Sequence, residues 1–244
     1  MSTQTGAIVW EGASQLDGSP IVCIATWGSK NPKTGDAIQT WILRADMVPA
    51  EASHTGADSA ICGKCPLRGL IEEGRLTGRR CYVNLGFAPR VVFLKYKRGG
   101  YERLTAETAT KYCAGKMLRL GAYGDPVAIP RDAWDLLLDS CASHAGYTHQ
   151  WGTRKFDAYR TLLMASCENV KQAAIAQARG WRTFRTGKTG VKGEILCPAS
   201  AEAGKLKTCA ECGLCDGASR KAKSVYIPAH GGRSIMGNWE RANA

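Results

Sequence analysis

The chain has 244 residues, 44% of them hydrophobic and 8% aromatic, and carries a formal net charge of +12. This length and composition support a buried core and exclude both wholesale disorder and a small disulfide-stapled scaffold. No apolar run reaches the roughly 18 residues of a membrane span, and the start, MSTQTGA, lacks the basic and apolar regions of a signal peptide. We therefore expect a cytoplasmic protein with no membrane partner.

Residues 1–56 form a predicted β-rich region. Three short runs of β-branched, aromatic and aliphatic residues, at 7–10, 21–27 and 39–43, are separated by segments rich in Gly, Asp, Ser and Pro. Such runs between turn residues are typical of strands joined by turns. Residues 57–90 follow as a loop-rich stretch that carries the first group of cysteines.

Between residues 115 and 196, short apolar runs alternate with helical patterns. This alternation predicts βαβ units and a parallel sheet. No Pro/Ser-rich linker divides the chain, so we expect a single α/β domain over 1–244 whose sheet forms a partial or complete TIM-barrel-like βα barrel. The predicted strands are 117–121, 146–151, 163–166, 181–186 and 193–196, the helices are 131–141, 156–162 and 169–179, and a last strand at 224–228 precedes a polar tail.

The segment 197–244 holds the second and denser group of cysteines. In a reducing compartment, clustered thiols favour metal ligation over disulfides. Their C-x2-C-x2-C run is similar to runs that bind cubic iron–sulfur clusters, whereas zinc sites more often use two separate pairs. We expect a closed [4Fe–4S] site, with Pro198 and Gly213 bending the backbone, and a zinc-stapled loop as the alternative. Four ligands lie within nineteen residues: Cys197, Cys209, Cys212 and Cys215.

The first group has only three cysteines, Cys62, Cys65 and Cys81, in the spacing C-x2-C-x15-C. For a closed site, His54, Cys113 or a residue distant in the sequence is the candidate fourth ligand. A functional cluster instead leaves one iron open for a substrate or cofactor. We favour a [4Fe–4S] cluster over zinc here, and any catalytic function belongs to this incomplete group.

Polar residues follow several predicted strands, at 121–125, 148–151, 166–169 and 182–185. The carboxyl ends of parallel strands meet at one edge of a sheet, so these residues predict a single pocket. In an enzyme, its candidate catalytic groups are Asp125 and His149 for proton handling and Arg185 for anion binding.

Each of these residues also has a structural interpretation. Asp125 before Pro126 fits a turn, Asn169 fits a helix cap, and His149 fits a structural histidine. The remaining cysteines are expected to be buried small hydrophobes: Cys23, Cys141 and Cys167.

The positive charge makes nucleic acid a candidate partner. Arg182 and Arg185, interleaved with Trp181 and Phe184, lie either on a solvated basic face or on a surface that binds phosphates and stacks bases. Three lysines and a further arginine would add phosphate contacts in the second case: Lys95, Lys97, Lys188 and Arg98. The hypothesis that competes with an iron–sulfur enzyme is therefore a zinc-stabilised protein that binds DNA or RNA.

Six segments spread over most of the chain are similar to those of a family of small, cysteine-rich bacteriophage and prophage proteins: DAIQTWIL at 36–43, GADSAIC at 56–62, CYVN at 81–84, GYTHQW at 146–151, GWRTFR at 180–185 and TCAECGLC at 208–215. The resemblance implies a location in the host cytoplasm and adds a third hypothesis, a factor that binds and modulates a host protein. The sequence leaves the oligomeric state open.

A more distant resemblance rests on the order of three features: an early cysteine set ending in Cys81-Tyr82, the segment RLGAYGD at 119–125, and a late cysteine set. This order resembles radical S-adenosylmethionine enzymes with an auxiliary cluster. The resemblance implies a partial βα barrel, a three-cysteine cluster that holds S-adenosylmethionine at its open iron, and a second, fully ligated cluster. Those enzymes carry C-x3-C-x2-C in one loop, whereas here the three cysteines are spread over twenty residues.

Overall fold

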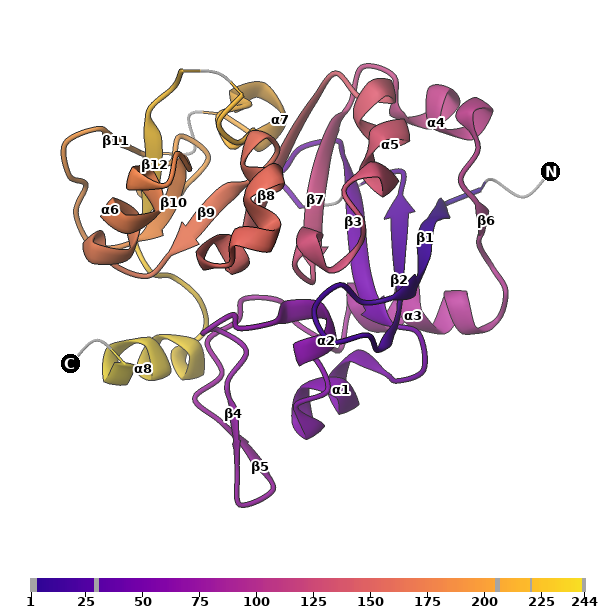
Figure 1. Ribbon diagram of the computed structural model, residues 1–244, viewed down its shortest axis with the longest axis horizontal. Coiled ribbons are helices and arrows are strands. Elements are labelled where there is room, and N and C mark those ends of the chain that lie inside the picture. Colours follow the sequence, from indigo (N-terminus) through magenta and orange to yellow (C-terminus); the bar gives the residue numbers. More distant parts are fainter. Residues whose placement is uncertain (1–3, 29–30, 205–206, 220, 243–244) are drawn as a thin grey trace.

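The computed structural model describes residues 4–28, 31–204, 207–219 and 221–242 (Figure 1). Its strands are β1 Gly6–Ala13, β2 Pro20–Thr26, β3 Ala37–Arg44, β4 Leu70–Glu72, β5 Arg75–Thr77, β6 Glu102–Arg103, β7 Met117–Tyr123, β8 Ser143–Thr148, β9 Met164–Cys167, β10 Thr183–Thr186, β11 Glu194–Leu196 and β12 Ser224–Ile227. Ten of them form one sheet in the order β11-β12-β10-β9-β8-β7-β3-β2-β1-β6, and β4 pairs with β5 in a separate hairpin that projects from the body.

The helices lie mostly in the connections between parallel strands. They are α1 Pro49–Thr55, α2 Ser59–Cys62, α3 Ala88–Lys97, α4 Ala106–Cys113, α5 Asp135–Ser140, α6 Val170–Ala178, α7 Cys209–Cys212 and α8 Arg233–Ala242, with 3-10 turns η1 Pro126–Ala128, η2 Asp132–Trp134, η3 Gln150–Gly152 and η4 Arg154–Thr161. Asn169 caps α6 by accepting from the Gln172 backbone N–H, as its structural interpretation predicts. None of these helices is long and apolar enough to cross a membrane, within the ranges described.

The run of strands from β3 through β7, β8, β9, β10 and β12 to β11 is parallel throughout. Only β2 runs against its neighbours, because it joins β1 and β3 through antiparallel pairings. The predicted mixed α/β fold with a mostly parallel sheet is therefore confirmed. Among the strands that the structure describes, β6 and β11 are the two edges of this sheet, and no pairing joins them.

Two predicted elements differ from the structure for identifiable reasons. The strand predicted at 146–151 begins and ends earlier, as β8, because the Thr148 hydroxyl and the His149 backbone N–H both donate to the Asp125 carboxylate and turn the chain away from the sheet. The tail predicted after residue 228 contains α8, which is held by the buried Trp239 and by a hydrogen bond from Asn238 Nδ2 to the Arg79 carbonyl (2.8 Å).

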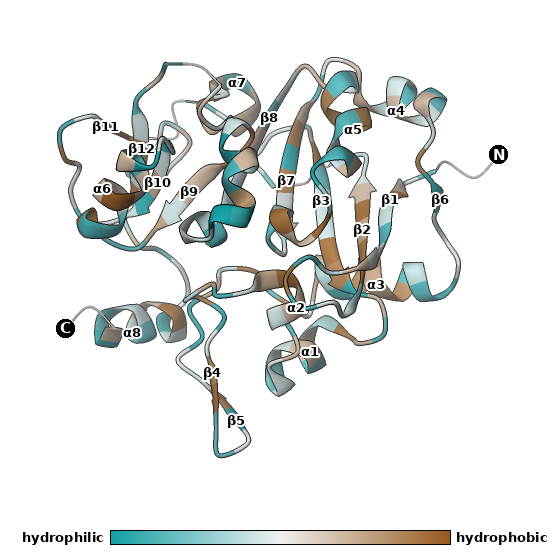
Figure 2. Ribbon diagram, in the orientation of Figure 1, coloured by the Kyte–Doolittle hydropathy of each residue, from teal (hydrophilic) through white to brown (hydrophobic). Residues whose placement is uncertain are grey.

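The sheet has two different faces, which follow from the alternation of side chains along a strand. Leu118 and Leu120 of β7 are buried in the main core together with Trp134 and Leu137 from the helical layer. The neighbouring Arg119 instead lines a cavity on the opposite face. Figure 2 shows hydrophobic colour along much of β2 and β3.

Gly146 tests how tightly β8 is packed. A Cβ at this position would lie 2.5 Å from Leu163 Cδ2 and 2.8 Å from Leu120 Cβ, whereas a Cβ at Gly152 would meet no atom within 4 Å. We expect Gly146→Ala to lower the free energy of unfolding by about 1–3 kcal/mol through overpacking. The matched Gly152→Ala should stay within about 0.5 kcal/mol of the wild type in urea denaturation. Equal effects would contradict this account.

Candidate functional site

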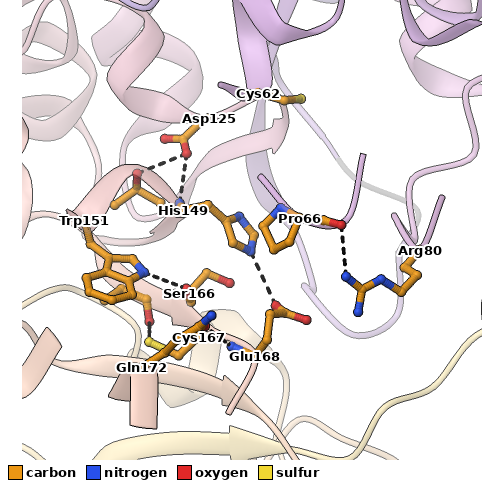
Figure 3. Close-up of polar contacts among 12 residues, drawn as sticks. Cys62, Pro66, Arg80, Asp125, His149, Trp151, Ser166, Cys167, Glu168 and Gln172 are labelled. Carbon is orange, nitrogen blue, oxygen red and sulfur yellow. Dashed lines mark hydrogen bonds and ion pairs between the residues drawn. The ribbon is translucent and has the colours of Figure 1, made fainter. Parts of the chain in front are cut away.

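Chemically reactive side chains gather at the carboxyl ends of four adjacent parallel strands. The three-cysteine group lies in the connection that follows β3, Asp125 follows β7, His149 follows β8 and Glu168 follows β9. Figure 3 shows Asp125, His149 and Glu168 close together, with Pro66 of the cysteine loop beside the His149 ring. The structure thus brings Asp125 and His149 side by side, because the His149 backbone N–H donates to the Asp125 carboxylate (2.9 Å).

Asp125 is buried and fully engaged in hydrogen bonds. Its Oδ2 accepts from the Thr148 hydroxyl (3.0 Å) and the His149 backbone N–H (2.9 Å). Its Oδ1 accepts from the Val127 backbone N–H, and its own backbone N–H donates to the Ile61 carbonyl of α2 (2.6 Å). Burial raises the pKa of Asp125, and the neighbouring His149 opposes that rise. Asp125 therefore joins the cysteine loop to two strand ends, which makes it a positioning residue.

Gln150 fixes the backbone turn between the first two cysteines. Its Nε2 donates to the Cys62 carbonyl (3.0 Å), and its Oε1 accepts from the Lys64 backbone N–H (3.1 Å). Gly63 has φ 54°, and a Cβ there would lie 2.6 Å from Gln150 Oε1. Only glycine leaves room for this amide. The sequence places Gln150 in the predicted pocket, within 148–151, but does not predict that it holds the cysteine turn.

Arginine side chains hold the third cysteine near the other two. Arg68 pairs with the buried Asp58 (2.6 Å) at the start of α2. The Arg80 backbone N–H donates to the Leu67 carbonyl (2.9 Å), and its guanidinium donates to the Pro66 carbonyl (3.1 Å). Arg79 donates to the carbonyl of Cys81 (3.1 Å). These contacts join segments 62–68 and 79–83, which are separate in the sequence.

The three thiols interact with one another electrostatically. Burial is the main cause that raises the pKa of Cys62, and the charges of Cys65, Asp58 and Cys81 add to it. Burial also raises the pKa of Cys81, although Arg79 opposes the rise. Thiols whose pKa is raised are protonated until a metal displaces the protons, so metal binding at this site would release protons.

His149 is the imidazole that the fold brings to the first cysteine group. Its Nε2 lies 3.6 Å from Glu168 Oε1, and both side chains are largely buried. Burial lowers the pKa of His149, but the Cys65 thiol and the Glu168 carboxylate together raise it to about 10. Within the part of the chain that the structure describes, neither Glu168 oxygen has a hydrogen-bond partner. The sequence places Glu168 in the predicted pocket, within 166–169, but does not predict its pairing with His149.

His54 and Cys113, the two named candidates for a fourth ligand of the first group, do not lie at that group. His54 is exposed on α1, and its Nδ1 lies 2.7 Å from the Ala50 carbonyl. Cys113 is buried at the end of α4, where its thiol contacts Cys141. Of the remaining cysteines, Cys23 and Cys167 are fully buried as predicted, whereas Cys141 is partly exposed. Among residues distant in the sequence, His149 is a candidate ligand at this group, since its imidazole interacts with the Cys65 thiol.

The second group is built mainly from local structure. Thr208 and Glu211 form a capping box at the start of α7, and Gly213 ends that helix at φ 61°. The predicted bend at Gly213 is thus confirmed, and it turns the chain toward Cys215. Backbone hydrogen bonds tie the group to the sheet: Cys197 N–H to the Tyr226 carbonyl (2.9 Å), Gly146 N–H to the Cys215 carbonyl (3.1 Å), and Cys209 N–H to the Lys33 carbonyl (2.8 Å).

The second group is also electrostatically coupled. Burial raises the pKa of Cys197 and of Cys209, and Lys33 and Arg119 oppose these rises. Burial raises the pKa of Cys215 to about 12, and a hydrogen bond with Tyr147 opposes the rise. The four thiols therefore interact with one another, with two cations and with one phenol.

One cavity of about 340 Å³ lies beside the second group and extends toward the first. All four cysteines of the second group line it, and Leu67, Tyr82 and His149, which are near the first group, line it too, whereas the three cysteines of the first group do not. Tyr147 and Phe184 also line it, packed beside the second group with their ring centroids 4.6 Å apart. No Asp or Glu is among the described residues that line this cavity, whereas Lys33 and Arg119 are.

The two thiol groups are not arranged around a metal ion. Across the described ranges, no three His, Cys, Asp or Glu side chains are placed to ligate a single metal ion. The donors that each group offers are thiols, which both tetrahedral zinc and iron–sulfur clusters use as ligands.

Arg185 does not join Asp125 and His149. It lies on β10 between Phe184 and Thr186, which line the cavity, and its guanidinium instead pairs with the fully buried Glu194 (2.6 Å). Arg182 is also buried, pairing with Asp216 (2.7 Å) and donating to backbone carbonyls. The expectation of a solvated basic face at these two arginines is therefore wrong, because each is neutralised by a carboxylate inside the fold.

Comparisons with protein-family models, curated proteins and solved structures find no match to this chain. Its function therefore has to be argued from the site itself.

Replacing Gln150 tests its role at the first cysteine group. Gln150→Ala leaves the Lys64 N–H and the Cys62 carbonyl without their partner, so we expect stability to fall by about 1–3 kcal/mol. Hydrogen exchange at residues 62–65 should accelerate. Gln177→Ala is the control, since this amide bonds Thr183 (3.2 Å) and Ser224 (3.4 Å) away from the cysteines. If both variants accelerate exchange at 62–65 equally, Gln150 does not fix the turn.

Arg185 is expected to be structural. Arg185→Ala leaves the Glu194 carboxylate buried without its cation, and the free energy of unfolding should fall by about 3–5 kcal/mol. The double variant Arg185→Ala/Glu194→Ala should recover part of that loss in chemical denaturation. Strictly additive losses would show that the two side chains do not depend on each other.

Proposed function

We propose that the chain is an iron–sulfur enzyme of the radical S-adenosylmethionine type, with a cluster at each cysteine group and a substrate in the cavity between them. The observation that carries this proposal is a cavity lined by all four cysteines of the second group that extends to Leu67, Tyr82 and His149 beside the first group. A closed structural site has no need of such a cavity. Thiols at one end of a cavity and an imidazole at the other suit chemistry on a bound molecule.

The position of the first group supports an open site. Its loop follows β3, the first strand of the parallel run, and ligands of such sheets bind beyond the carboxyl ends of their strands. The chain supplies three thiols there, while the His149 imidazole is directed toward Glu168 (Figure 3). When bound, a cluster of this type supplies one electron for the cleavage of S-adenosylmethionine into methionine and a 5′-deoxyadenosyl radical.

The residues around the cavity have distinct roles in this proposal. His149 holds a proton on its imidazole beside Glu168, which suits it to exchange a proton with a bound ligand. Tyr147 and Phe184 exclude water from the middle of the cavity. Asp125 and Gln150 keep the cysteine turn in place and take no part in the chemistry. The barrel that the sequence suggests is not shown, because the described strands form an open, mostly parallel sheet.

The competing zinc-stabilised nucleic-acid-binding protein has less support. Two of its proposed phosphate-binding residues, Arg182 and Arg185, are buried in ion pairs. The others lie at different parts of the fold, since Lys95 and Lys97 are on α3, which packs on β3, whereas Lys188 follows β10. We place the protein in the cytoplasm of a phage-infected or prophage-bearing host, where thiols stay reduced.

Metal analysis of anaerobically purified and reconstituted protein tests the proposal. We expect brown protein with about eight iron and eight sulfide per chain. Cys212→Ala and Cys81→Ala should each lose about half of the iron, and Cys81→Ala should also lose the reductive formation of 5′-deoxyadenosine. Cys141→Ala is the matched control and should keep both. Colourless protein with stoichiometric zinc would contradict the proposal.

The His149→Ala variant tests whether the cluster at the first group has an open iron or is ligated by His149. If the chain supplies only three ligands, this variant keeps its iron and still binds S-adenosylmethionine. Loss of half of the iron would identify His149 as the fourth ligand, and the open-iron part of the proposal would be wrong.

A further inference from the structure

We infer that the substrate is a single-stranded polynucleotide that lies in a basic groove beside the first cysteine group and places one base in the cavity. This inference rests on the proposed function, because it names the substrate of the same site. It starts from a second hollow, of about 750 Å³, between the cysteine loop, the β4–β5 hairpin and α8. We call this hollow the groove.

The groove carries excess positive charge. Lys64, Arg68, Arg80 and Arg241 line it, and among the described lining residues Glu72 is the only carboxylate. Asp58 neutralises Arg68. No hydrogen bond or ion pair to the exposed Lys64 ammonium is found in the described part of the chain, and Arg80 and Arg241 bond only to uncharged oxygens, those of Pro66 and Asn238. Three cations against one carboxylate suit a polyanion.

A thin wall separates the groove from the cavity. It consists of the linked segments 65–68 and 79–82, each of which has residues on both sides. Pro66, Arg68 and Arg80 line the groove, whereas Leu67 and Tyr82 line the cavity. Cys65 lies in this wall and borders the groove. A strand in the groove therefore passes beside the first cysteine group and the opening of the cavity.

Aromatic side chains line the cavity both at its opening and farther inside. Tyr82 lines the cavity and is 40% exposed, so it lies at the mouth, where His230 stacks on it with ring centroids 4.9 Å apart. Farther inside, Tyr147 and Phe184 form a second aromatic pair. The absence of carboxylates among the described lining residues removes repulsion of an anionic ligand.

Basic groove, exposed aromatic ring and enclosed aromatic cavity together favour a single strand over other anions. Proteins bind single strands with cations that follow the backbone and rings that stack on the bases. Enzymes that act on a base move it out of the stack into a pocket. A free small anion would make no use of three separate cations along a groove. A duplex cannot place a base in the cavity without first unpairing it.

The test is binding of labelled 12-mer single strands, RNA and DNA, to the reconstituted protein at several salt concentrations, measured by fluorescence anisotropy. Wild type should bind, with affinity falling as salt rises. Lys64→Gln/Arg241→Gln should reduce the salt slope by roughly 1 to 2. Lys188→Gln/Lys192→Gln removes the same charge from an exposed loop and should leave the slope unchanged. Equal effects of the two pairs, or no binding by wild type, would overturn the inference.

The stacking step has its own variants. Tyr82→Ala should weaken binding roughly tenfold to a hundredfold, and Tyr82→Phe should restore it. An abasic nucleotide in the strand should reproduce part of the loss in wild type but not in Tyr82→Ala. If Tyr82→Ala binds like wild type, no base passes this ring and the inference is wrong.

The design separates this inference from the proposed function. Iron content and visible absorbance of each variant report the clusters, and anisotropy reports the groove. Full cluster content without strand binding overturns only the substrate assignment. Strand binding by colourless, iron-free protein supports the groove and overturns the iron–sulfur proposal. Comparison of RNA and DNA binding shows whether the substrate contains ribose or deoxyribose, since a groove that contacts 2′-hydroxyls binds RNA more tightly.

Discussion

The site depends on the burial of one carboxylate. Leaving Asp125 inside the fold without partners would be costly, so its oxygens have to be satisfied from several elements at once. The donors come from the end of β8 and from η1, and its backbone N–H reaches α2. Because these contacts are mutually dependent, the cysteine loop has one position relative to the strand ends. The orientation of the His149 side chain and the position of Gln150 follow from this arrangement.

The two cysteine groups are held by different kinds of structure. In the second group, a capping box, a one-turn helix and a left-handed Gly213 fold the C-x2-C-x2-C run locally. In the first, side chains from outside the run do the same work: Gln150 holds the Cys62 turn, and Arg80 joins the segment before Cys81 to Pro66. A motif closed by local structure has to be compact in sequence, whereas one closed by tertiary contacts does not. This difference explains the wide C-x2-C-x15-C spacing.

The difference between local and tertiary contacts also determines which features of the fold and the site can be predicted from the sequence. Alternating apolar runs located β7, β9, α6 and the parallel sheet, and the rule that ligands collect at carboxyl ends brought Asp125 and His149 together. Arg185 was misplaced because its partner Glu194 lies beyond a turn, and charge alone does not tell a paired arginine from a free one. The roles of Gln150 and Glu168 depend on distances between segments that no local pattern records. Helix α8 was missed because its anchor, Trp239, is a single residue in a polar stretch.

In the proposed enzyme, the charges around the cavity determine which end attracts a polyanionic substrate. Four thiolates around a cubane would leave a net charge of about −2, which the nearby Lys33 and Arg119 would offset. That end of the cavity would then be close to neutral. The positive charge that is not offset lies at Lys64, Arg80 and Arg241, in the groove beside the first cysteine group. A polyanionic substrate would therefore bind at the end where the incomplete cysteine group lies, and the second group would face only the part of the substrate that enters the cavity.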